Sequence, residues 1–384
     1  MDYQLNESSL TLYFKGEINS YNASTIQEDV DSSIANLHFS SLILDFNDVS
    51  YVSSAGLRIV LRLKQKYNDV KIINASLEVY DVLQMTGFTN IMDVSKKLRH
   101  ISLDGAQLIG EGYFSYVYRL DRDTIIKVFK YADNVDDIQR ELNLAKEAFI
   151  LGIPTAISFD VVQVDGKYGV IFEMLESTEL RDLIRDQTDK YDEWLGKYVA
   201  LLNKINSTES DDERIPLTKQ IWFDKVDALE EYIGNANILK ARQLISSIKD
   251  EITFVHGDCH FKNILVQKDE LLLIDMDTLS RGNRIFEFAC LYAAYEAFEE
   301  EDPGNNLRFF GVSHEFADKL FKDLVRLCLK NSNDEVIDKI RIVTYIHILW
   351  WYSVNEKDNL HALNFFKDKL VDLLPKYNDL NIEG

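Results

Sequence analysis

Two apolar strands that each end at a carboxylate constrain this 384-residue chain more than any other feature. The first, an apolar strand in the stretch that begins at Phe254, leads into Asp258, and Asn263 follows five residues later. The second strand, at 271–274, ends in two carboxylates, Asp275 and Asp277. Together they supply a carboxylate to position an acceptor hydroxyl, an amide oxygen for Mg²⁺ and a second carboxylate for Mg²⁺. The pattern therefore predicts a site for phosphoryl transfer.

Two other interpretations of this stretch remain open. His256, Asp258 and His260 alternate along the chain, and such an alternation could also belong to a transition-metal site. That interpretation leaves Asn263 and Asp275 without a role. A purely structural turn built from aspartate and asparagine is the second alternative.

A glycine-containing turn lies upstream, between strands that we expect at 107–109 and 116–120. It holds Gly110 and Gly112, and Ser115 stands where a third glycine would complete a kinase-type loop. Glycines let the backbone approach phosphates closely and point its N–H groups at them. Taken alone, such a turn more often belongs to an ordinary hairpin.

Lys127 follows an apolar run in the next expected strand. A lysine on a strand that faces a cleft can bind phosphates as a point charge, although an exposed strand lysine is the simpler interpretation in isolation. Glu141, on the helix expected at 136–151, is predicted to orient it, and Glu147 is the competing candidate. The ordered set of turn, lysine, glutamate and the two strand-end motifs is far more specific than any one member.

The charge is strongly acidic and unevenly distributed. With 64 acidic and 42 basic side chains, the net charge is −22. Because a phosphate backbone needs a positive surface, this balance argues against nucleic acid as a partner. Residues 1–102 hold 12 acidic and 9 basic side chains, which leaves −19 on 103–384. The shift predicts two units that meet near residues 102–105.

The sequence also bears on the cellular compartment. Cys259, Cys290 and Cys328 are too few and too widely spaced for a disulfide framework or a CxxC metal site. The first residues lack the basic and apolar regions of a signal peptide, and no apolar run approaches about 18 residues. We therefore expect a cytoplasmic protein that does not associate with membranes.

The hydrophobic periodicity predicts an α/β fold followed by an α+β fold. Residues 1–102 alternate short strands and helices, which favours a mixed sheet with helices. Its strand at 41–45 is nearly all apolar and is expected at the centre of that sheet. The remainder predicts a small β-rich lobe over 103–175 and a large α-rich lobe over 176–384, with a cleft between them.

Residues 106 to about 375 resemble the aminoglycoside phosphotransferase/choline kinase-like family, a branch of the protein-kinase-like fold. The HGDxxxxN signature of that family is complete in His256, Gly257, Asp258 and Asn263. The resemblance implies a two-lobed phosphotransferase that uses ATP or GTP with Mg²⁺. It also implies a small-molecule hydroxyl as the acceptor, often in a cationic compound.

The same resemblance implies roles for the individual residues. Asp258 is implied as the catalytic base, and Asn263 and Asp275 as the metal ligands. Lys127 would bind the nucleotide phosphates, with Glu141 as its partner, beneath the glycine turn.

Three further positions follow from the resemblance. His256 would be structural and hold the catalytic loop. The backbone of the hinge from Glu173 to Leu175 would contact the nucleobase. Glu287 stands where the family has the aspartate of an Asp-Leu-Ala element, which leaves its role open.

Residues 1 to about 100 resemble STAS domains of the anti-sigma-factor-antagonist type, through the sequence SSAGLR at 53–58. A serine at the start of a helix is ordinarily a cap, but the same place also favours a phosphate. The resemblance implies Ser54 as a phosphoacceptor and an anti-sigma-factor-like protein as a partner. Ser53 replaces the more familiar aspartate.

The acceptor is not specified by these motifs. An acidic run at 299–302 and an aromatic cluster at 350–352 together suggest a cation-binding site. Core packing of Trp350 or Trp351 and a solvated acidic loop are the simpler interpretations. Two other functions remain as alternatives: a kinase that acts on a protein serine such as Ser54, or a non-catalytic nucleotide sensor in an anti-sigma-factor pathway.

Overall fold

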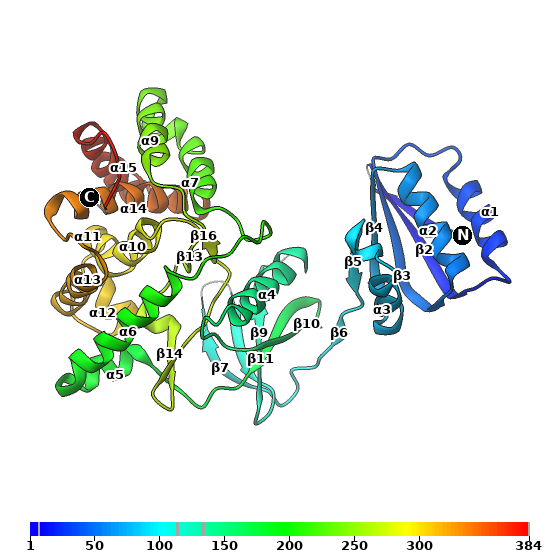
Figure 1. The fold of residues 1–384 in the computed structure, drawn as a ribbon, viewed down its shortest axis with the longest axis horizontal. Coiled ribbons are helices and arrows are strands. Elements are labelled where there is room, and N and C mark those ends of the chain that lie inside the picture. The colour runs from blue at the N-terminus through cyan, green and yellow to red at the C-terminus, as the bar shows by residue number, and fades with distance from the viewer. Residues whose placement is uncertain (7, 113–114, 132–134, 383–384) are drawn as a thin grey trace. The chain divides into compact units, whose positions relative to one another are not determined.

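The computed structural model describes residues 1–6, 8–112, 115–131 and 135–382, with the backbone alone at 135–137. The chain folds as two compact units, whose elements are labelled in Figure 1. The first unit is Met1–Ser102 together with Val162–Gly166. The second unit is Leu103–Val161 together with Lys167–Gly384.

The first unit contains a five-stranded sheet in the order β1-β2-β3-β4-β5, so that β3, the strand expected at the centre, is central. Its strands are β1 (Asp2–Asn6), β2 (Ser9–Ile18), β3 (Ser41–Val52), β4 (Asp69–Ala75) and β5 (Asp93–Lys96). Its helices are α1 (Ala23–Ile34), α2 (Ser54–Lys66), α3 (Leu77–Met85) and the 3₁₀ turn η1 (Phe88–Asn90). β1 is antiparallel to β2, and β2 to β5 are mutually parallel.

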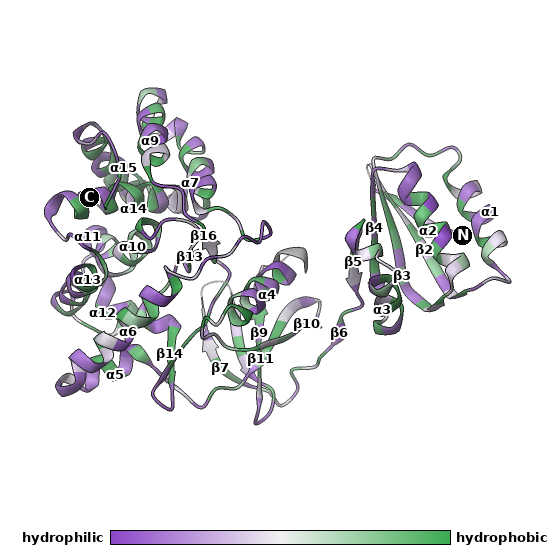
Figure 2. Ribbon diagram, viewed as in Figure 1, coloured by the Kyte–Doolittle hydropathy of each residue, from purple (hydrophilic) through white to green (hydrophobic). Residues whose placement is uncertain are grey.

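Alternate residues of β2 and β3 build the core of this unit. Leu10 and Leu12 on β2 and Leu42 and Leu44 on β3 are completely buried, because successive side chains of a strand point to opposite faces. The distribution of hydrophobic residues over these elements can be followed in Figure 2. The unit is the mixed α/β layer that the periodicity predicts.

A six-stranded sheet in the order β6-β10-β11-β9-β8-β7 carries the small lobe of the second unit, although its edge strand β6 belongs to the first unit. The strands are β6 (Arg99–His100), β7 (Gln107–Glu111), β8 (Ser115–Arg119), β9 (Thr124–Phe129), β10 (Ser158–Val164) and β11 (Lys167–Glu173). The helix α4 (Val135–Ile150) contacts β11. β6 pairs with Val162 and Gln163 of β10, which group with the first unit.

The large lobe is mostly helical and encloses one large apolar core. Its helices are α5 (Leu180–Asp186), α6 (Tyr191–Ile205), α7 (Thr218–Asp227), α8 (Glu230–Ile233), α9 (Asn235–Ser247), α10 (Ile285–Tyr292), the π-helical η4 (Ala293–Ala297), α11 (Phe298–Glu301), α12 (Asn305–Phe310), α13 (His314–Cys328), α14 (Asp334–Asn355) and α15 (Leu360–Leu373). Short 3₁₀ turns are η2 (Thr188–Lys190), η3 (Phe261–Asn263) and η5 (Leu374–Lys376). The β-rich small lobe and this helical lobe confirm the predicted fold class.

Two short β structures in the large lobe carry the strand-end motifs. One sheet holds β12 (Thr178–Glu179), β14 (Ile264–Gln267) and β15 (Glu270–Leu273), and a second pairs β13 (Phe254–Val255) with β16 (Ser280–Arg281). Thr155 ties the small lobe to this region, because its hydroxyl donates to Leu273 O at 3.0 Å. Among the described helices, none is long and apolar enough to span a bilayer.

Candidate active site

Lys127 joins two carboxylates that come from different parts of the second unit. It lies on β9, on the opposite face from the buried side chains of Ile126 and Val128. Its Nζ donates to Glu141 Oε1 on α4 at 3.1 Å and to Asp275 Oδ1, beyond β15, at 2.7 Å. Burial alone would lower the pKa of Lys127, but the two carboxylates outweigh it and raise the pKa. The side chain therefore stays cationic.

Glu141, and not Glu147, is the helix carboxylate that reaches this lysine. Burial raises the pKa of Glu141, and the charge of Lys127 opposes that shift. Glu147 instead pairs with Arg214 at 2.6 Å. The structure thus separates the two candidates that the sequence offered.

Asp258 and Asn263 contact each other within the loop that follows β13. Asn263 Nδ2 donates to Asp258 Oδ2 at 2.8 Å and to its main-chain oxygen at 3.1 Å, which leaves the amide oxygen as a group that can bind a cation. Burial, followed by the charges of Asp277 and Asp275, raises the pKa of Asp258 well above its usual range. Solvent still reaches 44% of the Asp258 side chain, so the carboxylate is accessible and does not lie in a closed core.

His256 uses both ring nitrogens to hold the loop. Nδ1 accepts the N–H of Asp258 at 3.2 Å, and Nε2 lies 3.2 Å from Ile274 O, which assigns the ring proton to Nε2. Burial lowers the pKa of His256 to about 4, so the ring is neutral at pH 7. Because neither nitrogen is left for a metal ion, the transition-metal alternative is wrong for this residue.

Glu287 is the residue whose role the sequence left open, and it supports the same loop from α10. Its Oε2 accepts the N–H of His256 at 2.6 Å, and its Oε1 accepts that of Gly257 at 3.2 Å. The side chain is completely buried, and burial raises the pKa of Glu287 to about 7 while these N–H groups lower it. The signal in the sequence was its position at the Asp-Leu-Ala element.

Two buried tyrosines hold the rest of the loop, and no motif pointed to them. The Tyr198 hydroxyl donates to Cys259 O and lies 3.2 Å from the hydroxyl of Tyr295. The Tyr295 hydroxyl in turn accepts the N–H of Phe261 at 2.9 Å. Cys259 itself is completely buried, and burial raises the pKa of its thiol well above the usual range.

The oxygen donors near Lys127 fit Mg²⁺ better than a transition metal. Asp275 provides a carboxylate, and its backbone adopts the left-handed conformation with φ of 58°. The preceding Ile274 N donates to Asn263 O at 3.0 Å, which keeps the two candidate ligands, Asp275 and Asn263, adjacent. Within the described parts of the chain, no three His, Cys, Asp or Glu side chains form a metal cluster. Mg²⁺ typically takes one or two protein carboxylates and completes its shell with waters and substrate phosphates.

The predicted glycine turn joins β7 and β8, and its tip at 113–114 lies outside the described residues. Gly112 N donates to Ser115 O at 2.9 Å, which closes the turn. Lys130, which sequence reasoning missed, donates to Gly112 O at 2.9 Å and to Glu111 Oε1 at 2.8 Å. Gly110 pairs with Val117 across the hairpin.

Two backbone N–H groups of the hinge at 173–175 donate hydrogen bonds to other residues of the protein. Glu173 N donates to Ile157 O at 3.0 Å, and Met174 N donates to Asp123 O at 2.7 Å. Of the three hinge N–H groups, only that of Leu175 has no hydrogen bond among the described residues. The expected nucleobase contact is therefore narrowed to Leu175 N–H and the hinge carbonyl groups.

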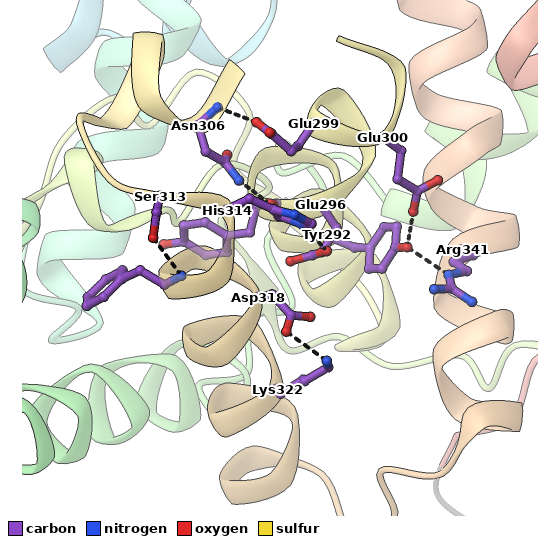
Figure 3. A network of polar contacts seen from close by, with 12 residues as sticks. Tyr292, Glu296, Glu299, Glu300, Asn306, Ser313, His314, Asp318, Lys322 and Arg341 are labelled. Atoms are coloured by element: carbon purple, nitrogen blue, oxygen red, sulfur yellow. Dashed lines mark hydrogen bonds and ion pairs between the residues drawn. The ribbon is translucent and has the colours of Figure 1, made fainter. Parts of the chain in front are cut away.

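The acidic run is tied into the large lobe and is not a solvated loop. Glu299 accepts the N–H groups of Gly304 at 2.6 Å and Asn306 at 2.7 Å, and Glu300 accepts the hydroxyl of Tyr292. Figure 3 shows Glu299 directed at Asn306 and Glu300 directed at Tyr292. The simple picture of free surface carboxylates is wrong, because these side chains satisfy groups within the protein.

Glu296, on the π-helical turn η4, is arranged differently. Its Oε2 lies 3.1 Å from His314 Nε2, as drawn in Figure 3, whereas its Oε1 is buried without a hydrogen-bond partner among the described residues. Burial raises the pKa of Glu296 to about 7, and the contact with His314 opposes that shift. A buried acceptor without a donor is destabilising unless a bound group supplies one.

Trp350, of the aromatic cluster, packs against a cation that belongs to the protein. Lys225 Nζ lies 4.9 Å from the ring centre of Trp350, 4.0 Å from that of Trp222 and 2.7 Å from His347 Nδ1. Burial lowers the pKa of Lys225 to about 8. Core packing is thus the correct interpretation of Trp350.

In the first unit, Ser53 caps α2, and Ser54 is the first helical residue. Ser53 Oγ accepts the N–H groups of Ala55 at 3.2 Å and Gly56 at 3.4 Å. Ser54 is exposed to solvent. The capping role that was the simple interpretation of this serine pair therefore belongs to Ser53.

Comparisons with known proteins agree with this geometry. A family model of the STAS domain matches residues 1–101, and the model of the phosphotransferase enzyme family matches residues 105–318. No curated protein matches the sequence.

Two solved structures illustrate the likeness in fold. The ADP-bound aminoglycoside phosphotransferase APH(2'')-Ib has a TM-score of 0.50 at 14% identity, and the match covers 70% of this chain and 94% of that one. The ternary complex of APH(2'')-IIa with streptomycin and ATP has a TM-score of 0.50 at 12% identity, with coverage of 70% and 93%. These likenesses establish the fold alone. With its family model matched over more than half of its length, this chain belongs to the phosphotransferase enzyme family and carries a STAS domain at its N-terminus.

Proposed function

We propose that the chain transfers the γ-phosphate of ATP or GTP, with Mg²⁺, to a hydroxyl group of a small molecule. The observation that carries the proposal is the contact of Lys127 with both Glu141 and Asp275, at 3.1 and 2.7 Å. It joins the small lobe to the strand-end carboxylate, which is the arrangement that phosphoryl transfer needs for positioning a charged phosphate.

Each residue has a separate task in this proposal. Asp258 accepts the proton of the acceptor hydroxyl, and Lys127 binds the phosphates. Asn263 and Asp275 would hold Mg²⁺, which supplies charge neutralisation on the phosphates when bound. Glu287 positions the loop through backbone N–H groups and does not touch the substrate.

A cationic acceptor remains part of the proposal, but fewer residues support it than the sequence suggested. The acidic run and Trp350 are engaged within the protein, so Glu296 is the remaining support. Its unpartnered Oε1 can accept a hydrogen bond from an ammonium group. Choline, simple amines and aminosugars are therefore the first compounds to test.

Nucleotide consumption by the purified chain, measured with Mg²⁺ and a panel of hydroxyl compounds, tests the proposal. Asp258→Asn should lower turnover by about 10²- to 10⁴-fold, because a general base contributes that much. Asp160→Asn, an exposed position on β10, is the matched control and should retain full turnover. Equal turnover in wild type and Asp258→Asn would refute the assigned mechanism.

A second acceptor, Ser54, is favoured by a specific observation. Because Ser53 provides the cap, the exposed hydroxyl of Ser54 is free of a structural duty at the helix start, where N–H groups and the dipole favour a phosphate. The reaction would occur within a chain or between copies.

Labelling with γ-labelled ATP and Mg²⁺ tests this acceptor. Label should enter wild type and Ser53→Ala but not Ser54→Ala, and Asp258→Asn should remain unlabelled. Equal labelling of wild type and Ser54→Ala would exclude Ser54 as the acceptor. Label in Asp258→Asn would point to a different kinase in the preparation.

A further inference from the structure

A cavity of about 700 Å³ lies in the large lobe, apart from the candidate active site. Its wall includes Lys219 and Phe223 of α7, Arg281 of β16 and Phe286 of α10. No residue with a task in the proposed phosphoryl transfer contributes to this wall. The wall mixes aromatic rings with charges of both signs, since Glu209, Asp250 and Glu251 also line it, and such a mixture is typical of a pocket for an amphipathic ligand.

Arg281 brings a buried positive charge into the wall. Only 7% of the residue is exposed. Its Nε donates to Ile215 O and its Nη1 to Ser210 O, both at 3.0 Å. Among the described residues, no carboxylate forms an ion pair with it. The two carbonyl groups use two of its five N–H donors, and the Asp212 carboxylate interacts with its charge without a close ion pair.

The lysines of the same wall already have acidic partners. Lys219 pairs with Asp250 at 2.5 Å, and Lys249 pairs with Glu251 at 3.0 Å. The guanidinium of Arg281 differs from these two lysines, because no described carboxylate forms a close ion pair with it. An anionic group is the ligand that would complete this wall.

The wall is also the back of the catalytic loop. Arg281 pairs with Phe254 of β13, which leads directly to His256 and Asp258. Gly282 N donates to Thr253 O at 2.8 Å. A ligand that moved this pair of strands would move the position of the proposed base.

A second connection runs through Asn206, another residue of the wall. Its Nδ2 donates to Phe254 O at 3.0 Å. Phe286 lines the cavity and precedes Glu287, whose carboxylate holds the loop. Both connections run from the cavity to the residues that hold the loop with Asp258.

We propose that this cavity binds a small organic anion and thereby regulates phosphoryl transfer. Its carboxylate or phosphate group pairs with Arg281, and its apolar body contacts Phe223 and Phe286. Binding does not depend on the proposed function, whereas the regulatory effect rests on it. The two parts are therefore measured separately.

Calorimetric titration of the full chain tests the binding part. Benzoate and phenyl phosphate are the probes, benzyl alcohol is the neutral control, and a saturating non-hydrolysable ATP analogue with Mg²⁺ blocks the nucleotide site. Both anions should bind and benzyl alcohol should not. Arg281→Gln should weaken binding by about tenfold or more, because a charge-assisted hydrogen bond is lost. Arg308→Gln, an exposed arginine paired with Asp302, should bind as wild type does.

Phe223→Ala keeps Arg281 and removes only apolar contact with the ligand. This variant therefore tests the proposed site even if Arg281→Gln does not fold. Phe223→Ala should weaken the binding of both anions by several-fold. Absence of binding by both anions, or unchanged affinity in Phe223→Ala, would overturn the site.

The regulatory part is measured as turnover with and without benzoate. A change in turnover that Phe223→Ala reduces supports it, whereas binding without any change in turnover overturns it. If the chain binds the anions but never consumes nucleotide, the proposed function fails and the site stands as a binding site alone.

Discussion

The two domains treat polar side chains in opposite ways. In the STAS domain, every buried side chain among the described residues is apolar, and the exposed Ser54 is its candidate functional group. The phosphotransferase domain buries charged groups, including Glu141, Lys225, Arg281 and Glu287. In the STAS domain, the exposed ion pair of Asp2 and Lys15 lowers the pKa of Asp2 and raises that of Lys15.

The difference reflects what each domain is built to do. A side chain that another protein must contact has to stay at the surface, where it is solvated by water. A catalytic loop must be held in one position, and buried hydrogen bonds to charged groups do this at a cost in stability. We therefore expect substitutions to affect activity in one domain and local helix stability in the other.

Outside the proposed catalytic base, the largest effect is expected from Glu287→Ala. It removes the acceptor for two backbone N–H groups of the catalytic loop, and a loop displaced by about 1 Å can lose on the order of 10²-fold in rate. The loss should appear in kcat, with KM for the nucleotide nearly unchanged, since Lys127 is untouched. Steady-state kinetics of the full chain measure both constants.

Two variants control this prediction. Glu287→Asp keeps a carboxylate and should recover part of the lost rate. Glu315→Ala, at an exposed position in the first turn of α13, should have no effect. If Glu287→Ala retained normal kcat, the buried carboxylate would not be needed to hold the loop.

The next effect concerns the stability of the phosphotransferase domain. Lys225 has a folded pKa of about 8, below its ordinary value of 10.5, because burial disfavours its charge. Between these values the unfolded chain binds more protons, so stability rises with pH from about 8 to 10.5. Lys225→Met should remove this dependence and stabilise the domain at pH 7 by up to about 3 kcal/mol.

Denaturant unfolding followed by tryptophan fluorescence measures this effect. All four tryptophans lie in 103–384, so the signal reports the phosphotransferase domain. The exposed Lys330→Met is the control and should keep the pH dependence of wild type. A pH dependence that persisted in Lys225→Met would contradict the assignment.

The smallest effect is expected in the STAS domain. Ser53→Ala removes the cap of α2 and should lower the local stability of that helix by about 1 kcal/mol. Amide hydrogen exchange of α2 in the full chain measures it. Ser54→Ala should leave the amide hydrogen exchange of α2 unchanged. A larger loss of helix stability in Ser54→Ala than in Ser53→Ala would contradict the assignment of the cap to Ser53.

The sequence predicted those features that depend on order along the chain. The strand-end motifs, the glycine turn and the apolar strand at 41–45 identified both domains and the central strand of the first sheet. Lys127 could be matched to Glu141 because helix geometry limits which residues of α4 face the sheet. The separation from Glu147 required the structure.

The remaining features depend on contacts between residues far apart in sequence. Tyr198 and Tyr295 meet beneath the loop, although 97 positions separate them. Lys225 meets Trp350 in the same way, which is why an aromatic cluster looked like a ligand site. A pattern of residue types cannot show that a cation is already supplied by the protein.

The burial of Cys259 beside the proposed base has a practical consequence. Its thiol, like those of Cys290 and Cys328, has a pKa raised by burial, to about 12 for Cys290 and about 11 for Cys328. Thiolate is the form that reacts with alkylating reagents and oxidants, so the raised pKa values lower the reactivity of these thiols at neutral pH, most of all for the buried Cys259 and Cys290. A cysteine introduced on the surface should therefore be labelled selectively by a maleimide dye, and the native thiols need not be removed first.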